Sequence, residues 1–357
     1  MNILFTCSAR KWGGNEAWVL HAAHLLKDKH RVFLAYRNPE IGGRFSVPAF
    51  RLPFRHEADI RTLAGLAGLI RKHSIDVVVP TKRKDYFLAG LACRLTGAKN
   101  VLILGIVRNL KNNAVDRLVY SRLADGIIVN AEVIREVLLQ SSFMKPEKIA
   151  VVPNSVEIDV QDIRPATGTA CFTVTSLAEL SERKGVDFLI RGFARFVQHY
   201  AVSDARLVIM GEGGEREKLG MLAKNLGIGD QVTFTGFLRN PYPHLLSGDV
   251  FALTSKNEGI PYAIIEAALL GNAIIATKAG GIEELLEEGK ECFYVGFGDE
   301  SLFARRLFEL YSDAGLRQKL ADHARKVASE RFSLEQMEQK MIVFLQNIIR
   351  GNCRRRH

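Results

Sequence analysis

The regular alternation of short apolar runs with amphipathic segments constrains the fold of this 357-residue chain more than any other feature. In the first half, strand-like runs are expected at residues 2–6, 32–36, 76–80, 101–104, 126–130 and 149–152. Helical periodicity lies between them, at residues 16–26, 60–71, 86–95, 115–123 and 133–139. Strand followed by helix, repeated in this way, predicts a parallel, doubly wound α/β sheet.

The same alternation begins again after a Pro- and Gly-containing stretch at residues 162–169, which is typical of a linker. Strands are expected there at residues 171–176, 207–210, 232–235, 250–253, 273–276 and 293–295. We therefore predict two doubly wound Rossmann-like domains facing each other across a ligand cleft, with boundaries at 1–165 and 166–332. The remainder, 333–357, is expected to be a C-terminal helix and a basic tail (Arg354, Arg355, Arg356), with the helix packed on the first domain.

Charge is distributed unequally between the two halves. Residues 1–165 carry 25 Lys and Arg against 15 Asp and Glu, so the whole net charge of +10 lies there, because residues 166–357 are balanced at 24 against 24. This asymmetry predicts an anionic partner for the first half. The chain has no apolar run long enough to span a membrane, we expect no signal peptide, and its five cysteines form no C-x-x-C pair, so a reduced, cytosolic protein is predicted.

The stretch 255–271 contains two acidic residues near the start of one predicted helix. Pro261 suits the first helical position, and the helix that follows is almost entirely apolar apart from Glu266. A carboxylate in such a run is costly unless it is hydrogen-bonded. Together with Glu258 on the approach loop, it could accept from vicinal hydroxyls while the helix end receives phosphate. The alternative is a helix cap plus a core acid paired with an arginine.

Arg183 and Lys184 are adjacent cations directly before a helix predicted at 186–196. The helix dipole disfavours cations at this end, which makes sense if an anion such as a diphosphate lies between them and the helix. A basic surface loop is the alternative.

Several common chemistries are not indicated. The segment Gly211-Glu-Gly-Gly lacks the third glycine of a dinucleotide fingerprint, and the chain has no P-loop, no Asp-x-Asp, no H-E-x-x-H and no nucleophile elbow. We therefore predict that the protein binds neither a metal ion nor a cofactor.

Taken together, these motifs resemble glycosyltransferase family 4 (group 1), retaining enzymes of the GT-B fold. The matching pieces span nearly the whole chain in order: Gly13-Gly14 with Glu16, Pro153-Asn154-Ser155-Val156, Ser181-Glu-Arg-Lys-Gly185, Gly211-Glu-Gly, Phe234-Thr-Gly-Phe, Glu258-Gly-Ile-Pro-x4-Glu266 and Gly271-x4-Ala276-Thr-x-x-Gly-Gly281.

The resemblance implies a role for each matching residue. Glu266 would accept from ribose hydroxyls, and Glu258 would hold hydroxyls of the donor sugar beside Gly259, Ile260 and Pro261. Arg183 and Lys184 would bind and stabilise the departing diphosphate, the task a divalent metal performs elsewhere. The remaining donor contacts would come from the glycine-containing loops at Gly13, Gly14, Gly211, Gly236, Phe237 and Leu238. The loop 105–111 has no His where family members often carry one. Either Arg108 or Asn109 substitutes for it, or the donor geometry differs, and the identity of the sugar stays open.

Basic residues also follow several strands of the first half, at the sheet edge where ligands bind. Those assigned to the acceptor are Arg10, Lys11, Lys82, Arg83, Lys84 and Arg108. We predict an anionic glycan or lipid-linked acceptor, such as a lipopolysaccharide core, with apolar neighbours touching the inner membrane surface (Leu52, Phe54, Tyr86, Phe87, Leu88). A solvated basic surface is the alternative.

The sequence thus predicts a metal-independent retaining glycosyltransferase that uses a nucleotide sugar and lies peripherally on the cytosolic face of a membrane. A sugar-nucleotide epimerase of the same fold and a non-catalytic protein docking on anionic lipid are the alternatives. Nucleic acid is not expected as a partner, because no stacking platform accompanies the basic residues. The donor-site hypothesis would be contradicted if the side chains of Arg183, Lys184, Glu258 and Glu266 pointed away from the gap between the lobes, or were locked onto one another in a closed salt-bridge cluster.

Overall fold

The computed structural model describes residues 1–166 and 171–351, which form two units. The first unit contains Met1–Ser155 together with the segment that begins at Leu334, and the second contains Val156–Ser333. The division therefore falls after Ser155, ahead of the expected boundary at residue 165. The expected basic tail, Arg354 to Arg356, lies outside the described residues.

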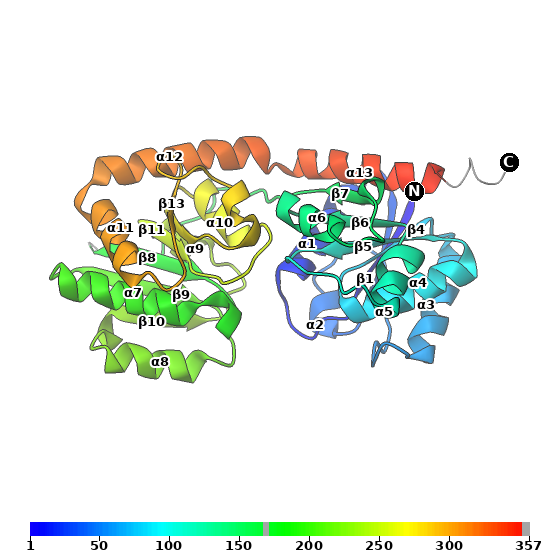
Figure 1. The fold of residues 1–357 in the computed structure, drawn as a ribbon, viewed down its shortest axis with the longest axis horizontal. Helices are drawn as coiled ribbons and strands as arrows, with labels where there is room; N and C mark the ends of the chain where they lie inside the picture. The colour runs from blue at the N-terminus through cyan, green and yellow to red at the C-terminus, as the bar shows by residue number, and fades with distance from the viewer. Residues whose placement is uncertain (167–170, 352–357) are drawn as a thin grey trace. The chain divides into compact units, whose positions relative to one another are not determined.

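The first unit is built on one parallel sheet (Figure 1). Its strands lie in the order β3-β2-β1-β4-β5-β6-β7. Its strands are β1 Asn2–Cys7, β2 Arg31–Tyr36, β3 Ala49–Arg51, β4 Val77–Pro80, β5 Lys99–Leu104, β6 Gly126–Val129 and β7 Ile149–Val151. All six expected strands are present. The sequence analysis missed β3, because a three-residue edge strand is too short to show alternation and its residues are half-buried or exposed.

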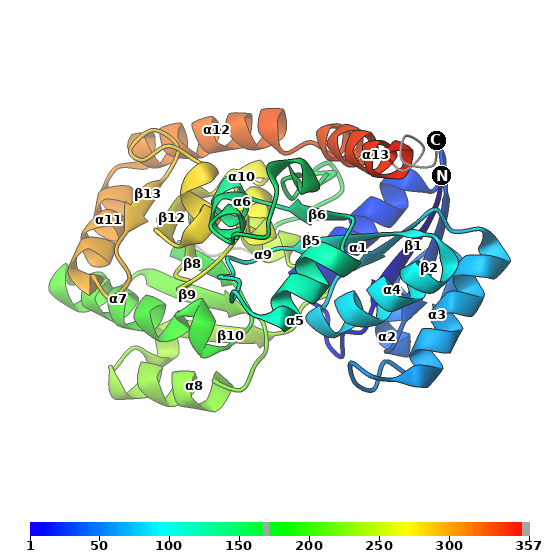
Figure 2. The ribbon, with the colours of Figure 1, turned by 45° about the vertical axis from the view of Figure 1, so that its right-hand side comes forward.

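Helices cover both faces of this sheet, as Figure 2 shows, with α3, α4 and η1 packed together on one face and α1 beside α13 on the other. The helices of the unit are α1 Gly14–Leu26, α2 Pro39–Gly42, α3 Ile60–His73, α4 Arg83–Thr96, α5 Ala114–Asp116, η1 Arg117–Leu123, α6 Glu132–Leu139, η2 Pro146–Lys148 and α13 Leu334–Arg350. The helix expected at residues 115–123 is instead one turn of α-helix followed by the π-helix η1.

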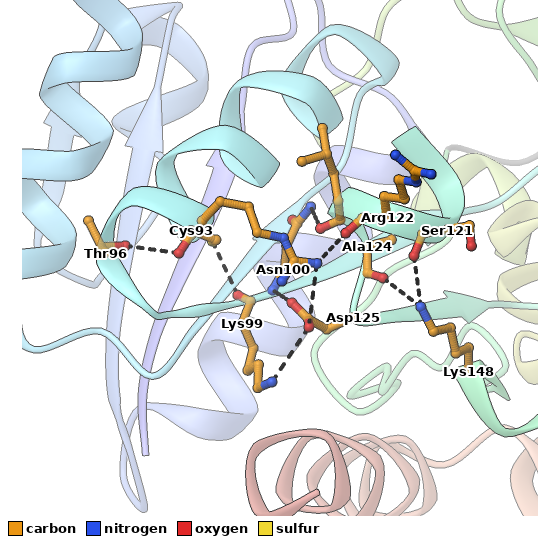
Figure 3. Close-up of polar contacts among 11 residues, drawn as sticks. Cys93, Thr96, Lys99, Asn100, Ser121, Arg122, Ala124, Asp125 and Lys148 are labelled. Carbon is orange, nitrogen blue, oxygen red and sulfur yellow. Dashed lines mark hydrogen bonds and ion pairs between the residues drawn. The ribbon is translucent and has the colours of Figure 1, made fainter. Parts of the chain in front are cut away.

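Polar contacts around η1 fix where the following strands begin (Figure 3). The Asp125 carboxylate accepts a hydrogen bond from the backbone N of Asn100 at 3.0 Å, which ties the start of β6 to β5. The Lys148 Nζ donates to the carbonyl oxygens of Ser121 at 2.8 Å and Ala124 at 3.1 Å. These carbonyls lie at the C-terminal end of η1, where backbone acceptors need such partners.

The C-terminal helix α13 belongs to the first unit, as predicted. Its apolar stripe buries Met337, Met341 and Leu345 against that unit. Gly126 at the start of β6 makes room for it, because a side chain there would come within 2.9 Å of the Phe344 ring. Packing of this stripe therefore explains why the end of the chain returns to the first sheet.

The second unit repeats the architecture with a parallel sheet in the order β10-β9-β8-β11-β12-β13. Its strands are β8 Phe172–Leu177, β9 Ala205–Met210, β10 Val232–Gly236, β11 Val250–Leu253, β12 Ala273–Thr277 and β13 Phe293–Val295, so all six expected strands are confirmed. The helices are η3 Glu182–Lys184, α7 Val186–His199, α8 Arg216–Asn225, η4 Gly229–Gln231, α9 Tyr242–Leu246, α10 Tyr262–Leu269, η5 Gly280–Glu284, α11 Glu300–Ser312 and α12 Ala314–Arg331. Helices α7 and α11 pack together, and α10 packs with α12.

Candidate functional site

The strand order of the second unit places a topological switch point between β8 and β11. From β8 the chain continues to β9 on one side, whereas β11 lies on the other side. Ligands bind at such a point, in the crevice beyond the carboxyl ends of the strands. The loop after β8 carries Arg183 and Lys184, and the loop after β11 carries Glu258, so the fold brings these predicted residues together.

Hydrogen bonds join these two loops directly. The Lys256 backbone N donates to the Arg183 carbonyl at 2.8 Å, and the Thr254 hydroxyl donates to the Gly185 carbonyl at 3.0 Å. Gly185 is required here, because its φ is +60° and a side chain would lie 2.2 Å from the Thr254 carbonyl oxygen. The close contact between the two loops therefore fixes the backbone that carries Arg183 and Lys184.

Arg183, Lys184 and Glu258 form a compact ionic cluster. The Arg183 Nη1 lies 3.2 Å from the Glu258 Oε1, and the Lys184 Nζ contacts the same oxygen. The Arg183 Nη1 also donates to the Asn257 carbonyl at 2.9 Å. Glu258 is buried, whereas the Arg183 side chain remains 39% exposed and that of Lys184 15%. Three of the four predicted side chains therefore contact one another, with one net positive charge.

Glu266 stands apart from this cluster. Its Oε1 accepts from the Tyr242 hydroxyl at 3.4 Å, and removal from water raises the pKa of its carboxyl to about 7, against a smaller lowering by that hydrogen bond. The four acidic and basic side chains consequently do not form one closed cluster. Tyr242, on α9, was missed by sequence reasoning because nothing in its spacing connects it with α10.

The start of α10 differs from the expectation in one detail. Pro261 is the N-cap, with extended backbone angles of −77° and 129°, and the helix begins at Tyr262. Gly259, Ile260 and Pro261 are buried, and the Gly281 backbone N donates to the Glu258 carbonyl at 3.2 Å. The loop after β12 therefore supports the segment that carries Glu258.

Glycines in the loop after β9 serve loop packing. Gly211 has a φ of +141°, and a side chain there would lie 1.9 Å from the Ala178 carbonyl oxygen. A side chain at Gly213 would lie 2.1 Å from the Leu180 carbonyl oxygen. These contacts let the β9 loop press against the loop that leads to Arg183. Gly211 therefore positions the neighbouring loop, and its contact with the donor stays a prediction.

The loop after β10 is held by the β9 loop. The Gly211 backbone N donates to the Gly236 carbonyl at 2.8 Å, and Gly236 has a φ of +76°. Phe237 is exposed and Leu238 half-buried, so both lie at the surface of the second unit beyond the carboxyl end of β10.

The first unit has its own switch point, between β1 and β4. There the Lys82 Nζ lies 2.9 Å from the Oε1 of Glu16, which is buried in α1. The Asp85 Oδ2 accepts from the backbone N of Ser8 at 3.1 Å, and burial raises the Asp85 pKa to about 6. These contacts hold the loop after β1. Lys82 is thus paired with a buried acid, and its contact with the acceptor stays a prediction. Asp85, which directly follows Lys82, Arg83 and Lys84 in the sequence, was missed.

The other predicted residues of this unit divide into two groups. Arg10, Lys11 and Arg83 are exposed, as are Gly13, the N-cap of α1, and Gly14, its first residue. The Lys84 Nζ donates to the Phe54 carbonyl at 3.3 Å, and the Arg108 Nη1 donates to the Tyr120 hydroxyl at 3.2 Å.

The suggested membrane contacts are partly wrong. Phe54, Tyr86 and Leu88 are buried in the first unit, whereas Leu52 and Phe87 are only half-buried. Their apolar character serves the core beneath β4 and α4. Within the described residues, no helix is long and apolar enough to cross a bilayer, and no group of three or more His, Cys, Asp or Glu side chains is arranged to hold a metal ion.

Two α/β units, each built on a parallel sheet, are the architecture of the GT-B class of fold. The family described as "Glycosyltransferase Family 4" matches residues 12–160, and the one described as "Glycosyl transferases group 1" matches residues 164–327. The chain belongs to this family, the family 4 (group 1) glycosyltransferases, as the motifs predicted.

Known proteins agree with this assignment. The chain is 29% identical over 229 residues to the lipopolysaccharide core biosynthesis glycosyltransferase LpsE of Rhizobium meliloti, covering 61% of this chain and 63% of that protein, less than two thirds of its length. It is 26% identical, over 88% of this chain and 91% of the relative, to the N-acetylgalactosamine-N,N'-diacetylbacillosaminyl-diphospho-undecaprenol 4-alpha-N-acetylgalactosaminyltransferase of Campylobacter jejuni. Among solved structures, Anabaena HepE in complex with UDP-glucose superposes with a TM-score of 0.84 at 21% identity, covering 97% of this chain and 100% of that one, which shows the shared fold.

Proposed function

We propose that this protein is a retaining glycosyltransferase that moves a sugar from a nucleotide-diphosphate sugar to an anionic acceptor. The observation that carries this proposal is the placement of Arg183 and Lys184 at the switch point of the second unit, clamped on the buried Glu258. Two cations on one loop, held in a fixed position beyond parallel strands, form an electrostatic site for a departing diphosphate.

The cluster can receive a diphosphate without first coming apart. A guanidinium has five N–H donors and an ammonium has three, so each cation can contact phosphate while it remains paired with Glu258. The exposed part of the Arg183 side chain supplies those donors. In this arrangement Glu258 first acts as the anchor of the two cations, and its contact with donor-sugar hydroxyls follows once phosphate shares the positive charge.

Glu266 completes the donor site. Its carboxylate, half-buried on α10, would accept from the two ribose hydroxyls, with the Tyr242 hydroxyl fixing its orientation. The Ser181 and Ser255 hydroxyls flank the cations, and within the described part of the chain these buried Oγ atoms have no hydrogen-bond partner. Ligand oxygens would satisfy them.

The proposed reaction follows from this charge distribution. As the bond between the anomeric carbon and the diphosphate oxygen breaks, negative charge grows on the leaving group beside Arg183 and Lys184. The acceptor hydroxyl attacks on the same face, so that the anomeric configuration is retained, and its proton passes to the leaving diphosphate. The two cations supply the charge stabilisation that a divalent metal supplies in other transferases, and we propose that turnover needs no metal.

The acceptor proposal draws on the basic first unit and on the relatives. LpsE is named for lipopolysaccharide core biosynthesis, and the Campylobacter enzyme is named for a diphospho-undecaprenol acceptor. We propose an acceptor of this kind, a lipopolysaccharide core or a lipid-linked glycan, reached by peripheral contact with the cytosolic membrane surface.

Release of nucleoside diphosphate from a panel of nucleotide sugars tests the proposal. With the purified acceptor fraction present, one donor should be consumed, activity should persist in a metal chelator, and Lys184→Ala or Glu258→Ala should abolish turnover. The anomeric configuration of the product, read by NMR from its one-bond C–H coupling, checks retention. Turnover unaffected by both substitutions would contradict the assigned site.

A further inference from the structure

A cavity of about 530 Å³ lies in the first unit beyond the carboxyl ends of β1, β2 and β3. One arginine follows or ends each of these strands: Arg10 after β1, Arg37 after β2 and Arg51 at the end of β3. Other lining residues are Asn38, Pro39, Leu52 and Pro53. The size is that of a pocket for a small molecule or a substrate substituent.

The backbone brings these arginines together. The Arg37 N donates to the Cys7 carbonyl at 3.1 Å, and the Leu52 N donates to the Tyr36 carbonyl at 2.9 Å. The Asn38 Nδ2 donates to the Arg10 carbonyl at 2.8 Å, while its Oδ1 accepts from the Glu40 N and caps α2. Strand ends and a side-chain clamp, rather than acidic partners, therefore hold the three cations around one space.

Among the described residues, none of the three arginines forms an ion pair. Lys84 adds a fourth cation nearby, and its pKa is lowered by burial and by repulsion from Arg37 and Arg10, against a partial offset from the Asp85 carboxylate. Gathering like charges in this way costs free energy, because each repels the others. An anionic ligand would remove the cost.

We propose that this cavity binds a phosphoryl group carried by the acceptor substrate, an inference that rests on the proposed function. Planar guanidinium groups bind phosphate oxygens bidentately. Three of them carry enough positive charge to balance a phosphoryl dianion, whereas a ligand with a single carboxylate would leave most of that charge unbalanced. Pro39, Leu52 and Pro53 add apolar wall area against which the carbon skeleton bearing the phosphate can lie. The phosphoryl group comes either from a phosphorylated sugar of the glycan or from a prenyl diphosphate.

Binding of soluble phosphoryl probes to the full chain tests the proposal independently of turnover. The donor site is first saturated with nucleoside diphosphate, and then glucose 6-phosphate or geranyl diphosphate is titrated by calorimetry, with glucuronate as the carboxylate comparison. We expect at least one phosphoryl probe to bind about tenfold more tightly than glucuronate, with Arg37→Gln and Arg51→Gln each weakening it about tenfold. Arg61→Gln, an exposed arginine at the start of α3, is the matched control and should change nothing.

The two phosphoryl probes identify the source. Preference for glucose 6-phosphate indicates a phosphorylated glycan, and preference for geranyl diphosphate indicates a lipid-linked acceptor. Arg37→Lys keeps the positive charge but loses the planar guanidinium group that contacts two phosphate oxygens. If the Gln variants do not fold, this variant is tested in their place, and weaker phosphoryl binding is expected. Phosphoryl binding that survives every arginine substitution, or glucuronate binding of equal strength, would overturn the proposal. Failure of the nucleoside diphosphate to bind, with the arginine effects intact, would instead contradict the proposed donor site.

Discussion

At the scale of single residues, the proposed donor site is defined by the pairing of two cations, Arg183 and Lys184, with the single carboxylate of Glu258. Its buried carboxylate neutralises one of two cations and fixes both, so Arg183 and Lys184 are presented with an excess of positive charge. Lys184 is the less exposed of the pair, and its ammonium group is therefore the less hydrated. A charge in such a position stabilises a developing anion more strongly than one in open water.

Lys184→Met should therefore lower kcat by about 100-fold, the effect of removing one stabilising donor from a developing anion. Steady-state kinetics with the cognate donor measures this change. Lys218→Met is the matched control, because Lys218 lies exposed on α8 in the same unit. A kcat within twofold of the wild type in Lys184→Met would show that the cation does not act on the leaving group.

Glu266 is expected to give nucleotide binding at the proposed site a pH dependence near neutrality. Because its pKa in the folded chain is raised to about 7, it is largely protonated at pH 6 and ionised at pH 8. Only the ionised form accepts from both ribose hydroxyls, so nucleotide affinity should rise about fivefold between these pH values. Calorimetric titration measures it, and Glu266→Gln should flatten the profile.

The same raised pKa has the opposite effect on stability. The native state holds a proton that the unfolded chain releases near its ordinary pKa of 4.5, so this contribution is complete below that pH and is lost as pH rises through about 7. Unfolding by urea at pH 5 and pH 8 should show a smaller loss for Glu266→Gln than for the wild type. An equal loss in both proteins would contradict the shifted pKa.

At the scale of elements, the loops of the second unit depend on glycines that permit contact between backbones. Gly213→Ala should displace the β9 loop, because its new Cβ would meet the Leu180 carbonyl oxygen at 2.1 Å. We expect weaker nucleotide binding, by about tenfold, and a loss of stability of about 1–3 kcal/mol. Gly214→Ala is the control, because no atom lies within 4 Å of its Cβ position. Equal nucleotide affinity in the two variants would contradict the claim that the contact between Gly213 and Leu180 positions the β9 loop.

Helix α13 stabilises the first unit through its apolar stripe. Met341→Ala should lower the free energy of unfolding of that unit by about 2–5 kcal/mol, since Met341 is fully buried. Val343, two residues along the same helix and 52% exposed, provides Val343→Ala as the control with little expected change. Urea denaturation followed by far-UV circular dichroism separates the outcomes, and similar effects of both substitutions would contradict the packing described.

At the scale of the whole molecule, the fold was largely predictable because strand and helix periodicities alternate without interruption. What failed were features that depend on partners distant in sequence. The π-helix η1 and the edge strand β3 carry no distinct pattern. The ion pair between Lys82 and Glu16, which is buried in α1, could not be predicted, because the two residues are far apart in sequence. Sequence spacing identified which residues gather at the switch points, but not which of them neutralise one another.

The arginine cavity shows the same limit. Arg10 was predicted as an acceptor contact and Arg37 directly follows the strand expected at residues 32–36, whereas Arg51 belongs to a strand that was not predicted. Only the order of strands in the sheet brings the three residues around one space. Net charge therefore predicted an anionic partner for the first half, and topology supplied the place for it.

The most direct test of the central claim is equilibrium binding of a panel of nucleoside diphosphates to the full chain, measured by calorimetry. We predict that one of them binds with micromolar or better affinity, that Lys184→Met and Glu266→Gln each weaken it at least tenfold, and that Lys218→Met leaves it unchanged. Absence of binding across the panel, or wild-type affinity in Lys184→Met and Glu266→Gln, would contradict the claim that the second unit holds an activated sugar through these side chains.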